Sequence, residues 1–226
     1  MCLPLLADGK SSADVLKKDA RPPEIFSIAG LVGIAPIRTG ESLNAQQVIV
    51  RPFHPGDARV MFEAARESIE QLRAWMTWCR PEYSKSDAEL FVSSCGRASQ
   101  KGEHFSFAIL DAQTGRFLGS AGLNHINLRH KFANVGYWIR KSANGKGVAT
   151  SAVQKVAEFG FAELGLNRLE FLIPALNVAS QRVAQKVGAE FEGVLKHRLI
   201  ISGKSHDAVM YSLMRPELKT LRIGRD

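Results

Sequence analysis

Residues 140–160, RKSANGKGVATSAVQKVAEFG, constrain the fold more than any other stretch of this sequence. A strand-like segment ends in two glycines, and small residues then lead into an amphipathic helix. The stretch contains four cations and no carboxylate before residue 158. A helix N-terminus leaves its first amide N–H groups unpaired and partly positive, and Gly145 and Gly147 keep side chains away from them. The pattern therefore predicts a loop that binds an anion such as a pyrophosphate, with Lys146 adding a full charge.

Other interpretations of this loop are weaker or less specific. The stretch 202–205, SGKS, has the end of a Walker motif, but Arg198 stands where that motif requires its first glycine. A dinucleotide fingerprint would begin with Gly145 and Gly147, but Thr150 replaces its third glycine. On the loop alone, an ordinary strand-to-helix connection in which the glycines only turn the chain stays open.

Hydrophobic periodicity predicts strands and helices on both sides of the loop. Hairpins near both ends, with a strand–helix–strand unit between them, indicate a mixed sheet in an α/β (α+β) domain. A capping box at Ser86–Glu89 is expected to open the second helix. The expected strands are 48–51, 104–110, 117–126, 133–139, 168–175, 195–201 and 206–213, and the expected helices are 57–73, 86–96, 149–164 and 177–187.

The chain divides into three parts. Residues 1–45 mix Pro, Gly and Ser with short apolar runs and are expected to form an N-terminal extension. Residues 46–215 are expected to form the domain, and residues 216–226 a basic C-terminal tail. The apolar run 26–37 is too short to span a bilayer, so neither a membrane partner nor a targeting segment is expected.

Charge and cysteine content narrow the class of protein. The net charge is +8, and residues 1–45 carry five cations and five anions, so the excess lies in the domain. Residues 128–146 carry five cations and no acid, which favours a polyanionic ligand at the loop over direct nucleic-acid binding. Cys2, Cys79 and Cys95 form no CxxC pair, so we expect no disulfide framework, no metal site and a reduced, cytoplasmic protein.

The loop and the segments after it resemble the GNAT superfamily of acyl-CoA-dependent N-acetyltransferases. The family's loop, [QR]-x-x-G-x-[GA], corresponds to Asn144, Gly147 and Ala149, with asparagine in place of the usual Gln or Arg. The stretch NVAS, from Asn177 to Ser180, resembles the family's N-x-x-S motif. The resemblance implies acetyl-CoA as cosubstrate, a primary amine as acceptor and no metal.

Further stretches are similar to the RimJ/RimL branch of the superfamily, whose members acetylate the N-termini of ribosomal proteins. The similar stretches are IVRPFHPGDA, LRAWMTW, GYWI, KVGAEFEGVLK and HDAVMYSL, and the resemblance covers about residues 46–215 but not residues 1–45. It implies a GNAT-like mixed, mostly antiparallel central sheet of about seven strands flanked by about four helices. It is also compatible with a homodimer.

The resemblance implies roles for residues around the loop. In this family the central strand splays from its neighbour at a bulge, where a backbone amide near Tyr137 would face the thioester carbonyl. Asn177 would hold the pantetheine arm, and the Ser180 hydroxyl would bond the leaving sulfur, although an N-cap and a solvated first-turn residue explain the same two positions. The expected cofactor-binding residues are Trp138, Ile139, Arg140, Asn144, Gly145, Lys146, Gly147, Val148, Ala149, Thr150, Asn177 and Ser180.

The general base is the least defined part of the expected site. Some members of the branch use a carboxylate on the first strand of the last hairpin, where this chain has Leu199. We therefore expect Glu103 or His125, on the adjoining hairpin, to be catalytic. His104, His197, Asp207 and a chain of water molecules stay open as alternatives.

The acceptor pocket is expected near Trp75, Trp78 and Asn134, although tryptophans three residues apart also fit plain core packing. The expected acceptor is the α-amine of a protein or peptide N-terminus. A small-molecule amine, such as a polyamine, an amino acid or an aminoglycoside, is the alternative. A third interpretation is an acyl-CoA sensor with impaired chemistry.

Overall fold

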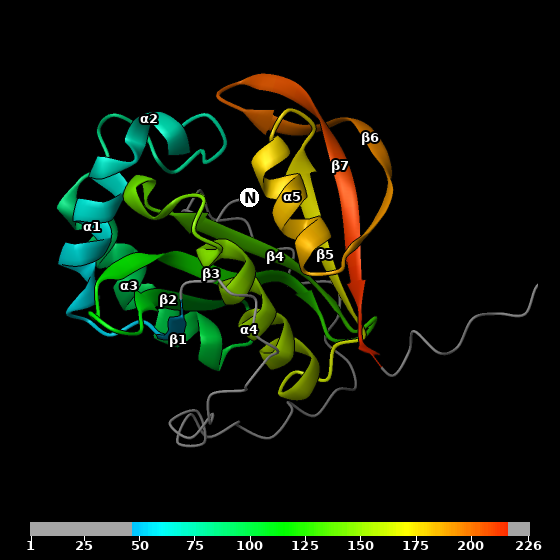
Figure 1. Cartoon of the computed structure of the whole chain (residues 1–226), viewed down its shortest axis with the longest axis horizontal. Helices are drawn as coiled ribbons and strands as arrows, with labels where there is room; N and C mark the ends of the chain where they lie inside the picture. The colour runs from blue at the N-terminus through cyan, green and yellow to red at the C-terminus, as the bar shows by residue number, and fades with distance from the viewer. Residues whose placement is uncertain (1–46, 217–226) are drawn as a thin grey trace, which may run out of the picture.

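The computed structural model describes residues 47–216 (Figure 1). The predicted extension of residues 1–45, and the predicted tail apart from residue 216, lie outside the described residues. In chain order the elements are β1 (Val48–Pro52), α1 (Asp57–Glu67), α2 (Ile69–Leu72), α3 (Lys85–Gln100), β2 (Phe105–Asp111), β3 (Phe117–Asn127), β4 (Phe132–Ile139), the 3-10 helix η3 (Lys141–Ala143), α4 (Val148–Ala162), β5 (Arg168–Pro174), α5 (Val178–Lys186), β6 (Glu190–Ile201) and β7 (Lys204–Met214).

The strands form one seven-stranded sheet in the order β1-β2-β3-β4-β5-β7-β6. Only β4 and β5 pair in parallel, and the other neighbours are antiparallel. The predicted mixed, mostly antiparallel sheet of seven strands is therefore confirmed. The one parallel pair divides the sheet into β1–β4 and β5–β7–β6, each joined internally by antiparallel ladders.

The helix predicted at 57–73 is interrupted at Ser68, which raises the number of α-helices in the described residues to five. The Ser68 hydroxyl donates a hydrogen bond to the Ala64 carbonyl at 2.7 Å, and the Ser68 backbone departs from helical geometry (φ −111°, ψ 5°). A serine that bonds back into the preceding turn competes with the helix ladder. The chain therefore turns between α1 and α2.

Two other boundaries differ from the sequence predictions. The capping box of α3 is formed by Ser84 and Asp87, so this helix begins before Ser86, and it continues through Gly96. Strand β6 begins at Glu190, five residues before the predicted start, because its first residues pair with β7. Side chains support this early pairing, since the rings of Phe191 and Tyr211 pack with their centroids 5.4 Å apart.

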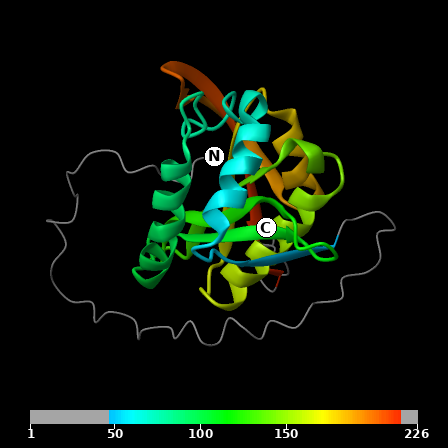
Figure 2. The ribbon, with the colours of Figure 1, turned by 90° about the vertical axis from the view of Figure 1, so that its left-hand side faces the viewer.

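Two hydrophobic cores cover opposite faces of the sheet. Figure 2 shows α3 on one side of the sheet and α4 and α5 on the other. Val153 and Val156 of α4 pack with Leu123 and Leu169 in the larger core. The smaller core joins α1, α3 and the segment after α2 to β2–β4, and its buried members include Met61, Ala65, Trp78, Val92 and Trp138. No helix within residues 47–216 is long and apolar enough to cross a membrane.

Candidate active site

The sheet opens between β4 and β5. The two strands pair only from Phe132–Arg168 to Asn134–Glu170 and then separate. A narrow pocket of about 20 Å³ lies in this opening. Its lining residues come from the segment after α2, from β4 and from the β5–α5 connection, and they are Trp75, Met76, Val135, Tyr137, Phe171, Leu172, Ile173, Pro174, Asn177 and Ser180.

Asn134 marks the point at which the two strands part. Its Oδ1 accepts a hydrogen bond from the Leu172 amide at 3.3 Å, and its Nδ2 donates to Asn124 Oδ1 at 3.0 Å. The side chain is 9% exposed and therefore buried. A side-chain amide thus takes the place of a ladder bond between β4 and β5. We predicted that Asn134 contacts substrate, but both ends of its amide bond to the protein and set the position of the opening.

Beyond Asn134, the edge of β4 that faces β5 has no strand partner among the described residues. The bulge predicted at the splay lies elsewhere, because the register shift is in the β3–β4 pairing between Asn124 and Asn127. The Tyr137 hydroxyl donates to the Ser180 carbonyl at 3.2 Å, so this side chain ties β4 to α5. Burial raises the pKa of Tyr137 to about 12, so the phenol stays protonated at neutral pH.

The first turn of α5 faces the same pocket. Asn177 is the N-cap of α5, and its Oδ1 accepts from the Ser180 amide at 3.2 Å. The predicted capping interaction is therefore present, and Asn177 also lines the pocket. The half-buried Ser180 hydroxyl has no hydrogen-bond partner within residues 47–216, which leaves it available to a ligand.

The glycine loop lies between β4 and α4. Gly145 and Gly147 both have φ 76°, and Gly147, with ψ −3°, is the N-cap of α4. This left-handed conformation favours glycine, since a Cβ would be strained there. No side chain of the part of the chain that the structure describes caps α4, so the first amides of the helix are available to an anion.

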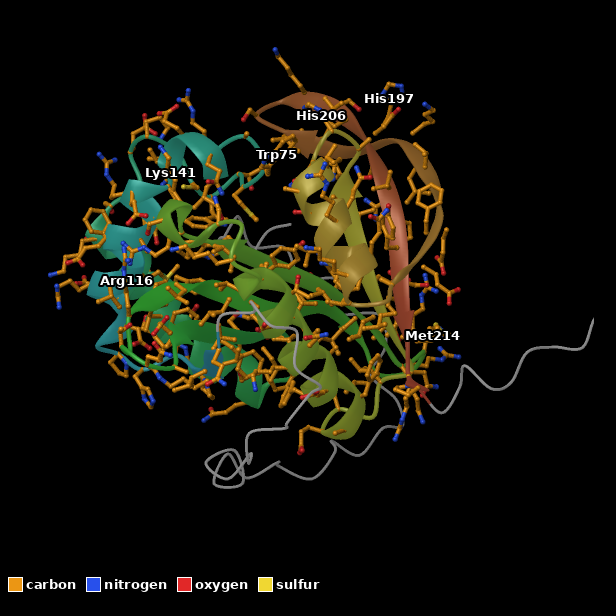
Figure 3. All side chains as sticks on the ribbon, in the orientation of Figure 1. Trp75, Arg116, Lys141, His197, His206 and Met214 are labelled. Atoms are coloured by element: carbon orange, nitrogen blue, oxygen red, sulfur yellow. The ribbon has the colours of Figure 1, made fainter. Side chains whose placement is uncertain are left out.

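Charge and exposure at the loop fit a pyrophosphate group. Lys141 and Lys146 are exposed, and neither forms an ion pair with a carboxylate of residues 47–216. Figure 3 shows Lys141 at the end of the loop nearest α2. Free helix amides, two left-handed glycines and two cations without an ion pair in residues 47–216 together form a site that can hold a pyrophosphate group.

Two other predicted cofactor residues use their side chains for contacts within the protein. The Arg140 guanidinium pairs with Glu67 and donates to the Phe117 carbonyl at 2.9 Å. Asn144 Nδ2 donates to Gln71 Oε1 at 2.6 Å. Their backbones belong to the loop, but their side chains connect it to α1 and α2.

The two tryptophans predicted for the acceptor pocket have different environments. Trp75 is half-buried and lines the pocket. Trp78 is 5% exposed and packs against Tyr83 and Trp138, with ring centroids 5.2 and 5.6 Å apart. Trp78 is therefore a core residue. The Trp138 side chain lies in the same core, so only its backbone is available on β4.

The two bases predicted first are not brought to the pocket. Glu103 is exposed and lies 3.8 Å from Lys101. His125 is exposed, has φ 49° and follows Asn124, whose partner Asn134 marks the closed end of the opening. Neither lines the pocket in the β4–β5 opening.

The other candidate bases also have different surroundings. Burial lowers the pKa of His104. Asp207 accepts hydrogen bonds from the His197 amide and from Lys196 Nζ, both at 2.9 Å, and these contacts hold its pKa below the ordinary value. No group of three or more His, Cys, Asp or Glu side chains in residues 47–216 could hold a metal ion.

His206 is a candidate that the sequence analysis missed. It pairs directly with Leu199 across the last hairpin and is half-buried. Ala208, two residues further on β7, pairs with Pro174 of the pocket, so His206 lies on the same face of the sheet as that residue. Counting back from the turn at Ser202 and Gly203 would have revealed this pairing.

A second, wider groove of about 480 Å³ adjoins the first pocket, and Met76 lines both. It separates the segment after α2 from the tip of the β6–β7 hairpin, which Figure 1 shows extending toward α2. Figure 3 places Trp75 and His206 at this same end of the molecule. The lining residues are Glu70, Arg73, Ala74, Met76, Thr77, Cys79, Arg80, Pro81 and Ser202.

Comparisons with known proteins match this architecture. Residues 47–190 match the family model described as an acetyltransferase (GNAT) domain. YdaF of Bacillus subtilis (strain 168), a candidate ribosomal N-acetyltransferase by name, is 27% identical over 173 residues, which cover 76% of this chain and 93% of YdaF. The spermidine N(1)-acetyltransferase of Escherichia coli (strain K12) is 30% identical over 87 residues, or 38% of this chain and 45% of that protein.

Solved structures agree on the fold. RimL, described as a ribosomal L7/L12 alpha-N-protein acetyltransferase in complex with coenzyme A, superimposes with a TM-score of 0.70. The match covers 75% of this chain and 95% of RimL at 20% identity, which shows a shared fold.

Proposed function

The chain belongs to the GNAT family and is an acetyl-CoA-dependent N-acetyltransferase, and we propose that it acetylates the α-amine of a protein or peptide N-terminus. The observation that carries this proposal is the groove of about 480 Å³ beside the narrow pocket. An acceptor amine that enters the pocket past Met76 would leave the rest of its chain in this groove. A small amine would leave most of the groove unused.

The cofactor-binding role follows from the backbone of the loop and of β4. Bound acetyl-CoA supplies an acetyl thioester. The first amides of α4, with Lys141 and Lys146, would hold its phosphates, and the unpaired edge of β4 would accept its pantetheine arm. An amide of this edge near Tyr137 would stabilise negative charge on the thioester carbonyl oxygen.

The first turn of α5 would serve the departing sulfur. The Ser180 hydroxyl is free to donate a hydrogen bond into the pocket, and the positive end of the α5 dipole lies beside it. A serine hydroxyl is a poor acid, so Ser180 would stabilise or relay rather than donate its proton outright. The bond from Tyr137 to the Ser180 carbonyl would hold this turn in place.

The amine must lose a proton before it attacks. An α-amine has an ordinary pKa of about 8 and therefore needs less help than a lysine side chain with a pKa of about 10.4. His206 does not line the pocket, but it lies at the same end of the molecule as Trp75 (Figure 3), and we assign it to this step, acting through water. Glu103 and His125 lie outside the pocket, which argues against the two bases predicted first.

A polyamine acceptor is the second candidate, because the spermidine acetyltransferase is among the relatives. A polycation needs carboxylates around it. Among residues 47–216, one carboxylate lines the groove, Glu70, which pairs with Arg73 at 3.0 Å, and Arg80 lines it as well. These charges favour a peptide over a polyamine.

We further propose a reducing, cytoplasmic location. Cys79 and Cys95 are buried free thiols, and burial raises their pKa values to about 11 and about 12. Buried, unpaired thiols are typical of such compartments. Homodimer formation stays a prediction.

Thiol release from acetyl-CoA tests the acceptor class. The protein is incubated with short peptides that have free N-termini, with the same peptides blocked at the N-terminus, and with small amines that include spermidine. Release with the free peptides alone, and mass spectrometry that places the acetyl group on the first residue, supports the proposal. Thiol release with small amines alone would exclude it. No thiol release with any acceptor, together with tight acetyl-CoA binding, would favour an acyl-CoA sensor.

A further inference from the structure

The start of the cofactor loop is fastened to the end of α1. Glu67 accepts hydrogen bonds from Arg140 Nε at 3.1 Å and from the Ser142 amide at 2.9 Å, and it also pairs with Arg140 Nη2. Arg116 lies on the same carboxylate at 3.8 Å and donates to Ser142 Oγ at 3.0 Å. The Arg140 interaction lowers the pKa of Glu67 to about 2, so the carboxylate remains charged at neutral pH.

The turn between α1 and α2 adds a second contact. The Ser68 hydroxyl accepts a hydrogen bond from the Lys141 amide at 2.9 Å while it donates to the Ala64 carbonyl. Ser68 is 1% exposed. The break between α1 and α2 therefore provides a buried acceptor for the loop backbone.

The third contact joins the loop to α2. Gln71 Oε1 accepts from Asn144 Nδ2 at 2.6 Å. Asn144 occupies the position at which the family's loop motif usually has Gln or Arg. Its shorter amide is held by α2 in this chain and does not extend over the first turn of α4.

The same short helix leads directly into the wall of the acceptor pocket. The Trp75 and Met76 amides donate to the Leu72 carbonyl at 2.9 and 2.7 Å, so the turn after α2 is hydrogen-bonded to it. Trp75 and Met76 line the pocket in the β4–β5 opening. Gln71, which contacts the cofactor loop, and Trp75, which lines the pocket, are therefore only four positions apart in the chain.

We propose that Glu67 and Gln71 are positioning residues that join the cofactor loop to the acceptor wall. Through Arg140, Ser142 and Asn144 they hold the loop in the conformation that binds phosphate. Through the turn after α2, the Gln71 contact also fixes Trp75 relative to the loop. Arg140 has a further role, because it neutralises a carboxylate that would otherwise repel the cofactor phosphates.

A double-mutant cycle of Gln71→Ala and Asn144→Ala tests the Gln71 contact. Calorimetry without acceptor measures acetyl-CoA affinity, and steady-state kinetics with an accepted amine measures the acceptor KM. Each single variant is expected to weaken acetyl-CoA affinity by about three- to tenfold and to raise the acceptor KM, since one hydrogen bond is lost. The acetyl-CoA affinity of the double variant should equal that of the single variant with the lower affinity, because both substitutions remove the same bond.

The exchanged pair Gln71→Asn with Asn144→Gln should restore affinity to within about twofold of the wild type, since it preserves the combined length of the two amides. If Asn144→Ala weakens acetyl-CoA binding while Gln71→Ala has no effect, Asn144 contacts the cofactor itself and the proposal is wrong. Additive losses would also overturn it. The acceptor readout rests on the proposed function, but acetyl-CoA affinity does not, so the two proposals can fail separately.

Glu67→Gln tests the contact with α1. It is expected to weaken acetyl-CoA affinity by about tenfold, since the charged contacts to Arg140 and Arg116 are lost together. Glu63→Gln, one turn earlier on α1, is the matched control, because Glu63 pairs with Arg59 at 2.7 Å and does not contact the loop. Equal affinity for the two variants, with both folded by circular dichroism, would exclude a positioning role for Glu67.

Discussion

The cofactor side and the acceptor side of the opening are built in different ways. The cofactor side uses backbone, namely the left-handed Gly145 and Gly147, the first amides of α4 and the unpaired edge of β4. The acceptor side uses side chains from segments far apart in the sequence, namely Trp75 and Met76 after α2 and Phe171 and Ile173 of β5. A backbone site depends on local geometry, whereas a side-chain site depends on how distant elements pack.

This difference determines how each side should respond to substitution. Backbone amides cannot be removed by mutation, so the cofactor side should fail mainly when something obstructs or charges it. Single side-chain changes should weaken the acceptor side and leave acetyl-CoA binding intact. Measurements of acetyl-CoA affinity and turnover can separate the two sides.

The largest effect is expected from Gly147→Glu. It adds a side chain where φ is 76° and places a negative charge at the first amides of α4. Juxtaposed like charges cost several kcal/mol, so acetyl-CoA affinity should fall by at least about a hundredfold in calorimetry. Gly102→Glu is the control, since Gly102 has φ 68° and open space around it, and it lies before β2 at the end of the sheet opposite the loop. Unchanged affinity for Gly147→Glu would remove the cofactor site from this loop.

Ser180→Ala is expected to have the second-largest effect, and this effect should be on turnover alone. The hydroxyl is free to contact the leaving sulfur. A side chain that transfers a proton raises the rate by at least about a hundredfold, and Ser180 would only stabilise or relay, so we expect kcat to fall by about ten- to a hundredfold. Acetyl-CoA affinity should stay within about twofold, because α5 keeps its Asn177 cap. Ser93→Ala, on the exposed face of α3, is the control. An undiminished kcat would make Ser180 a solvated helix residue.

His206→Ala tests the acceptor side. We expect kcat/KM for the acceptor to fall by about tenfold, because a water-mediated path would remain after the imidazole is lost. Acetyl-CoA affinity measured without acceptor should not change. His130→Ala, on the exposed β3–β4 connection, is the control. Weaker acetyl-CoA binding in His206→Ala would show that the two sides of the opening are not separate.

The smallest effect is expected on stability, when the pH is lowered. The folded pKa of Glu67 is about 2, below its ordinary value of 4.5, so its contribution to stability is present above about pH 4.5 and is lost as the pH falls toward 2. For a partly exposed pair this contribution is less than about 1 kcal/mol. Urea unfolding of wild type and Glu67→Gln should therefore differ at pH 7 and converge near pH 2. A constant difference across this range would assign the stabilisation to packing rather than charge.

Local sequence patterns were sufficient to predict the turn at Gly145 and Gly147 and the helix that follows it. Two glycines, the acid-free stretch before them and the small residues after them require no distant partner to be interpreted. The same holds for the Asn177 cap. The sheet could be predicted because hairpin turns and hydrophobic alternation fix strand neighbours.

Contacts between distant elements could not be predicted in the same way. The spacing of Trp75 and Trp78 does not reveal that one lines the pocket and the other packs on Trp138. Nothing near Asn134 in the sequence indicates that its amide bonds to Leu172, and nothing near Asn144 indicates Gln71. His206 is an exception, since the tight turn at Ser202 and Gly203 fixes its partner by simple counting.

The two parts of the sheet that meet at the narrow junction between β4 and β5 are each formed by one continuous stretch of the sequence. All of β1–β4 precedes residue 140, and all of β5–β7 follows residue 167. A backbone cut in the 163–167 connection would leave every antiparallel ladder intact. Reassembly would depend on the three residue pairs between β4 and β5 and on α4. Gly160 of α4 lies so close to Leu123 of β3 and Leu169 of β5 that an added Cβ would come within 3.0 and 3.3 Å of them. The glycine loop and β4 would lie on one fragment and Asn177 and Ser180 on the other, so acetyl transfer would itself report fragment complementation.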